Sequence, residues 1–375
     1  MNSRQRVIRA IEHKEIDRYP IDLGAHFSTG ISAFAYYNLR KYLGLSIDNI
    51  EICDNVQMLA RVDEDILERF HCDAMVLRPK WLYKTVWNVR DEYKFIVSEK
   101  MNPSMDENGN WRVTDGERKM RMPEGGYFFD GDWVSTKEVN EEEEFVLLGK
   151  EAERIYKETD YFTILMGGFN GYFLGIDNAC DMYTDPDIVM EQNKAMHSFH
   201  LKRFDNILNH MGGYIQAIDI NSDLGTQSAP MISPDMYEQF CYPFLKELCS
   251  TVHNNSDIKL FLHSCGSIEP LLPYIIDAGV DILNPVQVSA GNMDPKLLKD
   301  KYGSKICFWG GGCNTQKTLT TGTVQDIKEN VKALTDVFKV GGGFVFNQVH
   351  NIMGDVPPKN IVAMLDTAYE NSFYK

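Results

Sequence analysis

Eight short apolar runs, each ending in polar or glycine-containing residues, constrain the fold of this chain more than any other feature. They lie at residues 19–24, 74–79, 162–168, 215–219, 260–263, 281–285, 306–311 and 344–348. Continuous apolar runs of this length are typical of strands buried on both faces of a parallel sheet. Helical patterns lie between several of them, for example at residues 187–208, 234–252 and 323–338. Eight strand–helix units in 375 residues predict an α/β fold, a TIM (β/α)8 barrel.

The main alternative for this pattern is an open doubly wound sheet. That fold usually has a glycine-rich phosphate turn early in the chain, and no G-x-G-x-x-G follows the first apolar runs. Residues 83–133 break the strand–helix rhythm, because turn signals such as Asn108-Gly109 alternate there with short β-type segments. We therefore predict one domain over residues 1–375, with a β-hairpin insertion at residues 83–133.

Charge and apolar content exclude several classes of partner. The chain has 38 Lys and Arg against 54 Asp and Glu, a formal net charge of −16, so neither nucleic acid nor an acidic membrane surface is an expected partner. No apolar run approaches the roughly 18 residues that cross a bilayer, and none of signal-peptide length follows the start. Eight scattered cysteines indicate buried thiols and a metal site rather than a disulfide framework. We predict a cytoplasmic protein and leave open whether it is a homodimer.

Polar residues at the ends of the runs are the candidates for chemistry, because reactive groups of such barrels lie at the carboxyl ends of the strands. They are Asp22, His26, Asp219, Asp223, His263, Cys265, Gln287, Cys313, Asn314 and His350. Asp219 and Asp223 are candidates for acid–base catalysis, and capping of the next helix is the alternative. Phe169 and Tyr172 follow the third run and can wall a pocket for a flat apolar ligand, although packing in the core is the commoner role of such residues.

His263 and Cys265 form the sharpest feature at these strand ends. Residues i and i+2 of an extended strand face the same way, so one imidazole and one thiolate can converge at the barrel mouth. Zinc accepts both ligand types and usually takes four ligands. Cys313 is the predicted third ligand, and His350 competes for that place. The alternative is that the pair simply packs in the protein.

Four segments around these residues resemble the uroporphyrinogen decarboxylase superfamily. They are FLHSCGSI at 261–268, GVDILNPVQ at 279–287, FWGGGCNTQ at 308–316 and HNIMGDVPPKNI at 350–361. The resemblance is strongest over residues 210–370 and implies a TIM barrel, in agreement with the count of apolar runs. Decarboxylases of this superfamily hold their polyacid substrate with an N-terminal arginine-glycine-arginine segment. The corresponding residues 22–30 contain no arginine, which argues against that activity.

The resemblance favours the corrinoid-dependent methyltransferase branch, in which an H-x-C pair and a distant third ligand hold zinc. His263 and Cys265 match the pair, and His350 stands where members that methylate coenzyme M have a distant cysteine. This difference weakens the case for a thiol, such as that of coenzyme M, as the methyl acceptor. The glycine-rich stretch at 309–316 is closer to members that take methyl groups from a donor.

The resemblance thus implies transfer of a methyl group from a methylated small molecule to the cobalt(I) of a corrinoid (cobalamin) on a separate protein. A phenyl methyl ether such as vanillate, veratrol or guaiacol is the best candidate donor, which makes the reaction an O-demethylation. Asp223 or His350 would supply a proton. The implied substrate contacts are Asp22, His26, Phe169, Tyr172, Gln287 and Asn314, with Asp219 beside them. The alternatives are a methylcobamide:thiol methyltransferase, a decarboxylase and a non-catalytic barrel.

Overall fold

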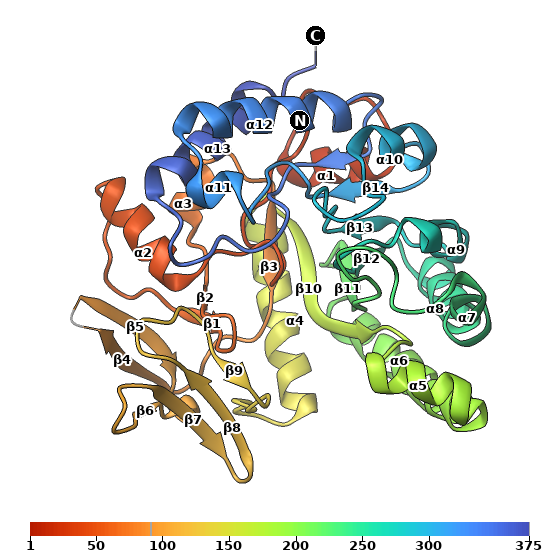
Figure 1. Ribbon diagram of the computed structural model, residues 1–375, viewed down its shortest axis with the longest axis horizontal. Coiled ribbons are helices and arrows are strands. Elements are labelled where there is room, and N and C mark those ends of the chain that lie inside the picture. The colour runs from red at the N-terminus through yellow and green to blue at the C-terminus, as the bar shows by residue number, and fades with distance from the viewer. Residues whose placement is uncertain (91, 375) are drawn as a thin grey trace.

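A seven-stranded parallel sheet, curled around a common axis, forms the centre of the computed structural model, which describes residues 1–90 and 92–374 (Figure 1). In spatial order the strands are β15 (Phe344–Val345), β14 (Cys307–Trp309), β13 (Ile282–Asn284), β12 (Lys259–His263), β11 (Ala217–Asn221), β10 (Phe162–Asn170) and β3 (Ala74–Leu77). All neighbouring pairs are parallel, so their carboxyl ends lie at one end of the sheet. Seven of the eight predicted runs are these strands.

The remaining run, at residues 19–24, joins the two edge strands. The Phe346 amide donates to the Pro20 carbonyl over 2.8 Å, and the Asp22 amide donates to the Phe346 carbonyl over 2.9 Å, just beyond β15. On the other side, the amide of Asp73, which precedes β3, donates to the Ile21 carbonyl over 2.7 Å. Residues 20–22 therefore lie between β15 and β3. The predicted α/β fold of the TIM type is confirmed. Its first strand position is occupied by the short segment at residues 20–22.

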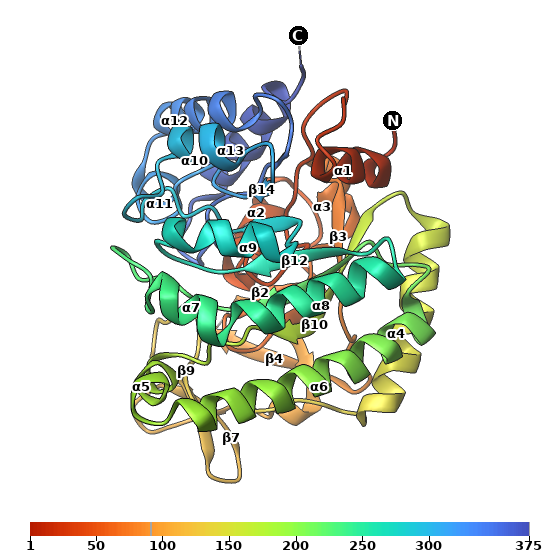
Figure 2. The same cartoon turned by 90° about the vertical axis from the view of Figure 1, so that its right-hand side faces the viewer.

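Helices pack around the outside of the strands (Figures 1 and 2). They are α1 (Ser3–Ile11), α2 (Ala33–Tyr42), α3 (Glu64–Arg69), α4 (Glu141–Glu158), α5 (Ile176–Thr184), α6 (Pro186–Met211), α7 (Pro234–Phe240), α8 (Tyr242–Asn255), α9 (Leu272–Ala278), α10 (Pro295–Tyr302), α11 (Thr318–Thr321), α12 (Val324–Phe338) and α13 (Pro358–Glu370), with 3₁₀ turns at Glu99–Met101 and Glu269–Leu271. Across residues 1–90 and 92–374, no helix is both long and apolar enough to cross a membrane.

One predicted helix is divided in the structure. The pattern at residues 234–252 predicts a continuous helix, whereas α7 ends at Phe240 and α8 begins at Tyr242. Pro243 explains the break, because proline has no amide hydrogen to donate and its ring clashes with the carbonyl four residues earlier in a continuous helix. In the structure Pro243 lies in the first turn of α8, where that amide is not needed.

The insertion contains more strands than the predicted hairpin. Strands β4 (Lys84–Arg90) and β5 (Tyr93–Ser98) form one antiparallel pair, and β6 (Ser104–Met105), β7 (Trp111–Asp115), β8 (Arg118–Met122) and β9 (Asp130–Gly131) form a second antiparallel sheet. A short pair, β1 (Ile52–Asp54) and β2 (Leu59–Ala60), precedes them. The rings of Trp87 and Trp111 pack edge to face, 5.0 Å apart, between the two sheets of the insertion. The division into one domain with an insertion at 83–133 stays a prediction.

The barrel interior is filled with large side chains, which form a floor below the strand ends. Phe162, Phe261 and Trp309 are fully buried there, and the Trp309 ring lies 6.0 Å from that of Phe162 and 5.3 Å from that of Phe261. The Trp309 indole donates to Asp22 Oδ2 over 2.8 Å, which fixes the ring. A buried cluster of Arg6, Arg18 and Asp73 closes the opposite, amino end of the barrel.

Candidate functional site

The site begins where β12 ends, at His263. The chain turns sharply after Cys265, and Gly266 makes this turn with a φ of +88°. A Cβ atom at position 266 would lie only 2.5 Å from the Gly225 carbonyl oxygen, so any other residue would push the two loops apart. The turn brings the Cys265 thiol back over the strand end, where Sγ lies 3.6 Å from His263 Nε2.

His350, in the loop after β15, brings a third donor to the same point. The ligand atoms of His263, Cys265 and His350 all lie within 4.8 Å of one another. The His350 ring packs edge to face on His263, with centroids 6.0 Å apart. Ligands around one tetrahedral zinc ion, with bonds of about 2.0–2.3 Å, are about 3.3–3.8 Å apart. Small side-chain movements would therefore let these three donors share one ion.

Asn284, at the end of β13, sets the orientation of the His263 ring. Its Nδ2 donates to the Trp309 carbonyl over 2.9 Å, so its Oδ1 is the atom that faces His263 Nδ1, at 3.0 Å. An amide oxygen only accepts, so His263 carries its proton on Nδ1 and presents a lone pair on Nε2. Metal-binding histidines are commonly held this way, with the second ring nitrogen donating to an oxygen. The donor set therefore fits a metal ion.

Burial tunes the three donors. It lowers the pKa of His263 to about 4, with the nearby His26 acting in the same direction, and it lowers the pKa of His350 to about 4, with His263 adding to the effect. Both imidazoles are thus neutral near pH 7, the form that binds metals. Burial and the Asp223 carboxylate raise the pKa of Cys265 to about 12. The thiol would release its proton on metal binding.

Asp223 lies at the open side of the three donors. Its Oδ1 accepts the Cys265 amide over 3.0 Å and lies 3.6 Å from His263 Nε2. Its side chain is 62% exposed, whereas that of His263 is 6% exposed. Asp223 is therefore the solvent-exposed acidic group of the site.

His26 and Asp219 lie deeper, beside His263. The rings of His26 and His263 are 5.4 Å apart, and His26 Nε2 is 3.5 Å from Asp219 Oδ2. Asp219 also accepts the amides of Gly167 and Gly168 over 3.1 and 2.5 Å. Both oxygens of this buried carboxylate therefore hold the irregular end of β10, so Asp219 anchors the strand end and lines the deep side of the site.

Several predicted substrate contacts have protein partners instead of a free side chain. Burial raises the pKa of Asp22 to about 6, and its oxygens accept from the Trp309 indole and the Ala25 amide. Gln287 Oε1 accepts the Gly266 amide over 2.8 Å, which supports the turn after Cys265. Asn314 Oδ1 accepts the Lys317 amide over 3.1 Å. In the structure, these side chains stabilise the loops at the barrel mouth through hydrogen bonds to backbone amides.

Phe169 and Tyr172 pack between the sheet and the helices outside it. Phe169 packs edge to face on His200 of α6, and the Tyr172 hydroxyl lies 2.8 Å from His197 Nδ1 of the same helix. Tyr172 also stacks on Phe244 of α8. Both rings are buried in the main hydrophobic core, so their position is that of core residues.

Cys313, the predicted third ligand, is likewise part of that core and is fully buried. Its backbone carbonyl accepts the Val349 amide over 3.0 Å, which ties the tips of β14 and β15 together. The three-donor group contains His350 and not Cys313. The sequence analysis did not select Asn284 or Ser28, whose hydroxyl donates to Asn284 Oδ1 over 2.6 Å. The signal that could have found them is position, since Asn284 lies at the end of the run at 281–285 and Ser28 comes after the run at 19–24.

Fold and site together define an α/β barrel with nitrogen and sulfur donors converging at the end where such barrels carry out their chemistry. The family described as "Uroporphyrinogen decarboxylase (URO-D)" matches residues 180–371, just over half of the chain. The chain belongs to this family, which confirms the resemblance inferred from the four segments.

Individual relatives are distant. A uroporphyrinogen decarboxylase of Psychromonas ingrahamii is 21% identical over 374 residues, 98% of this chain and 97% of that protein. One from Chlorobium phaeobacteroides is 27% identical over 150 residues, 38% of this chain and only 40% of its own length. The structure of a methyltransferase from Methanosarcina mazei superposes with a TM-score of 0.62 at 16% identity and covers 99% of both chains. The last comparison shows that the whole chain has the same fold as that protein.

Proposed function

We propose that this protein is a zinc-dependent methyltransferase that moves a methyl group from a methylated small molecule to the cobalt(I) of a corrinoid on a separate protein. The best candidate donor is a phenyl methyl ether such as vanillate, veratrol or guaiacol. One observation carries the proposal: His263, Cys265 and His350 present their donor atoms to one point at the barrel mouth.

The donor set supports a Lewis-acid role for a bound metal. Zn²⁺ held by His263, Cys265 and His350 would polarise the ether oxygen of the substrate, which makes the phenolate a better leaving group. Three protein ligands leave one zinc position for that oxygen. Asn284 accepts a hydrogen bond from Nδ1 and so keeps the Nε2 lone pair of His263 directed toward the point that it shares with Cys265 and His350.

Asp223 is our candidate for the acid that donates a proton to the leaving group. Proton transfer to the departing oxygen needs an acid within reach of the site, and Asp223 lies 3.6 Å from His263 Nε2 on the exposed side. We assign His350 to the ligand set rather than to acid catalysis, because its donor atom belongs to the three-donor group. The buried His26 and Asp219 would line the deep wall against the substrate.

Two further observations favour this function over decarboxylation of a polyacid. Residues 22–30 contain no arginine, and the chain carries a net charge of −16. In the structure, contacts such as Ser28 on Asn284 and Gly30 on Asn351 hold this segment against the barrel. We also propose a cytoplasmic location, because all eight cysteines are free thiols, as expected in a reducing compartment.

The test is methyl transfer from a panel of methoxyarenes to cob(I)alamin. The change in the absorbance of the corrinoid measures the transfer. Asp223→Asn is expected to lower the rate about 10²- to 10⁴-fold, the usual contribution of a general acid. Asp257→Asn is the matched control, since Asp257 is an exposed carboxylate before the amino end of β12. If no methoxyarene reacts while methylcobalamin methylates a thiol, the proposed donor and direction are wrong.

A further inference from the structure

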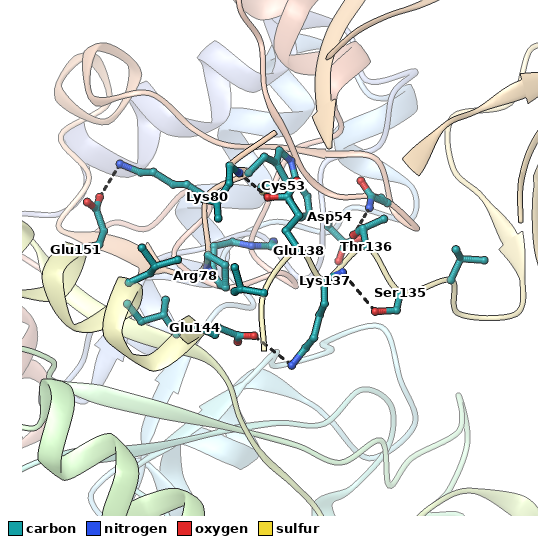
Figure 3. A pocket seen from close by; sticks show the side chains of 18 of the residues that line it. Cys53, Asp54, Arg78, Lys80, Ser135, Thr136, Lys137, Glu138, Glu144 and Glu151 are labelled. Atoms are coloured by element: carbon teal, nitrogen blue, oxygen red, sulfur yellow. Dashed lines mark hydrogen bonds and ion pairs between the residues drawn. The ribbon is translucent and has the colours of Figure 1, made fainter. Parts of the chain in front are cut away.

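A cavity of about 560 Å³ opens beside the end of β3 (Figure 3), and His263, Cys265 and His350 are not among the residues that line it. Its walls are the loop after β1, the residues following β3, the connector at residues 133–139 and one face of α4. This volume is within the roughly 300–1,000 Å³ typical of small-molecule sites. None of the predicted site residues lines it, so the cavity is separate from the proposed zinc site.

The cavity nevertheless belongs to the functional end of the barrel. Arg78 directly follows β3, so it lies at the same end of the parallel sheet as His263. The loop after β1 is also tied to the zinc site. Within it, Gln57 Oε1 accepts the side-chain amide of Asn351, the neighbour of His350, over 2.7 Å.

Charge in the cavity is opposite in sign to that of the chain as a whole. The lining residues include the cations Arg78, Lys80, Lys137, Lys150 and Arg154 and the carboxylates Asp54, Glu138, Glu144 and Glu151. Each carboxylate already has partners. Glu144 pairs with Lys137 and Glu151 with Lys80, at 3.1 and 2.7 Å.

The other two carboxylates accept from uncharged groups. Glu138 accepts from the Ser98 hydroxyl over 2.6 Å and from the Leu82 amide over 2.5 Å, and Asp54 accepts the Gln57 amide over 2.8 Å. By count, the lining has one cation more than it has carboxylates.

Two cations of the lining, the exposed Lys150 and the half-buried Arg78, make no hydrogen bond or ion pair with another described residue, and Arg78 is the more buried of the two. It is half-buried, and within residues 1–90 and 92–374 it has neither a hydrogen bond nor an ion pair to another residue; Figure 3 shows its side chain among the lining residues, with no dashed line to any of them. A guanidinium has five N–H donors in a planar fork that matches a carboxylate. A half-buried arginine with all five donors free is suited to an anionic ligand.

The remaining wall is apolar and contains two indoles. Trp81 is half-buried, and its Nε1 donates to the Ile52 carbonyl over 2.6 Å, which fixes the ring at the edge of the cavity. Trp133 lines the cavity and is 66% exposed, and Leu147 of α4 is 37% exposed. Exposed large apolar side chains gathered around a cavity indicate a ligand with an apolar body.

We propose that this cavity binds an aromatic monocarboxylate, with the carboxylate on the Arg78 guanidinium and the ring against Trp81. The proposal does not depend on the methyltransferase function, because it concerns a binding site that shares no residue with the zinc site.

Isothermal titration calorimetry of the full chain tests it with three probes: 2-naphthoate, 2-naphthamide and acetate. The amide keeps the ring without the charge, and acetate keeps the charge without the ring. We expect 2-naphthoate to bind at least about tenfold more tightly than either, since hydrogen bonds to a charged partner contribute about a factor of ten or more. Equal affinity for naphthoate and naphthamide, or no binding of naphthoate at about 5 mM, would overturn the proposal.

Variants locate the site. Arg78→Met should remove the preference for naphthoate over naphthamide. Lys150→Met, which neutralises an exposed cation of the same cavity, should change the naphthoate affinity less than about twofold, as a rim charge does. Equal losses in both variants would mean general charge attraction and would contradict the assignment to Arg78. If Arg78→Met does not fold, Arg78→Gln and the three-probe comparison on the unchanged protein decide the matter.

Discussion

Both ends of the barrel hold a buried cluster of ionisable side chains, and the clusters differ in how completely they are paired. At the amino end, Asp73 accepts from Arg6 Nη1 at 2.7 Å, from Arg18 Nη1 at 2.8 Å and from the Ile21 amide at 2.9 Å. At the carboxyl end, the donor atoms of His263, Cys265 and His350 face one another instead of partners of their own. Removing one member of a fully paired buried cluster leaves a buried charge without its partner, which destabilises the fold. Donor atoms that face one another at the carboxyl end of a barrel are instead available to a ligand.

The largest expected effect breaks the amino-end cluster. Asp73→Asn leaves the buried Arg18 guanidinium without a carboxylate and Arg6 with Asp17 alone, so the free energy of unfolding should fall by about 3–5 kcal/mol. Urea denaturation followed by circular dichroism measures it. Asp366→Asn, which removes the exposed partner of Arg69, is the control and should cost less than about 1 kcal/mol. Similar small losses in both variants would remove the contrast drawn between the two ends.

Two cysteine variants compare the site with the core. Cys265→Ser removes a sulfur donor and should weaken zinc binding by more than about a hundredfold, while the melting temperature without metal changes little. Cys313→Ser places a hydroxyl in the apolar core and should cost about 1–3 kcal/mol of stability without loss of zinc. Zinc content by mass spectrometry separates the outcomes. Loss of zinc from a folded Cys313→Ser protein would restore the third ligand predicted from the sequence.

A smaller effect is expected from the residue that orients His263. Asn284→Ala frees the ring and its tautomer, so zinc affinity should fall about 10- to 100-fold, as for other outer partners of metal ligands. Competition with a chromophoric chelator measures the affinity. Asn360→Ala is the matched control, because Asn360 is equally buried but bonds to carbonyls beside α11. If both variants bind zinc equally well, Asn284 does not orient a ligand.

The smallest effect is a pH dependence of zinc affinity. The Cys265 thiol, with its pKa raised to about 12, holds a proton that the zinc-bound form lacks, so apparent affinity rises with pH. The pKa values of His263 and His350 are lowered to about 4, so between pH 6 and 8 they contribute no protons. One proton should be released per zinc, a tenfold gain or about 1.4 kcal/mol per pH unit. A slope near two or three would mean that the histidines are also protonated in the metal-free protein.

How far the sequence predicts the fold depends on how deeply each segment is buried. The barrel strands were recognisable because both of their faces are covered, which leaves continuous apolar runs such as residues 260–263. The insertion was predicted as a single hairpin, because two-residue strands such as Ser104–Met105 carry too little pattern to be recognised. The break at Pro243 was missed because the apolar spacing of a helix continues through it.

The site was predictable to the extent that it is local. His263 and Cys265 are two residues apart, so backbone geometry alone places them together. The third donor, His350, is distant in sequence. Whether His350 or Cys313 faces the pair depends on how the loops after β14 and β15 are held together. The cavity beside Arg78 has no local signal, because its walls come from four separate segments.

Periodicity and short motifs are enough to predict the barrel class, the family and the nitrogen–sulfur pair at the end of the fifth run. Three features appear only in the folded chain: the closure of the barrel through residues 20–22, the grouping of His350 with that pair, and an Arg78 side chain that has no partner among residues 1–90 and 92–374. The physical reason is that each of these depends on contacts between segments far apart in the chain. Such contacts are set by the packing of the whole barrel and not by the pattern of any one segment.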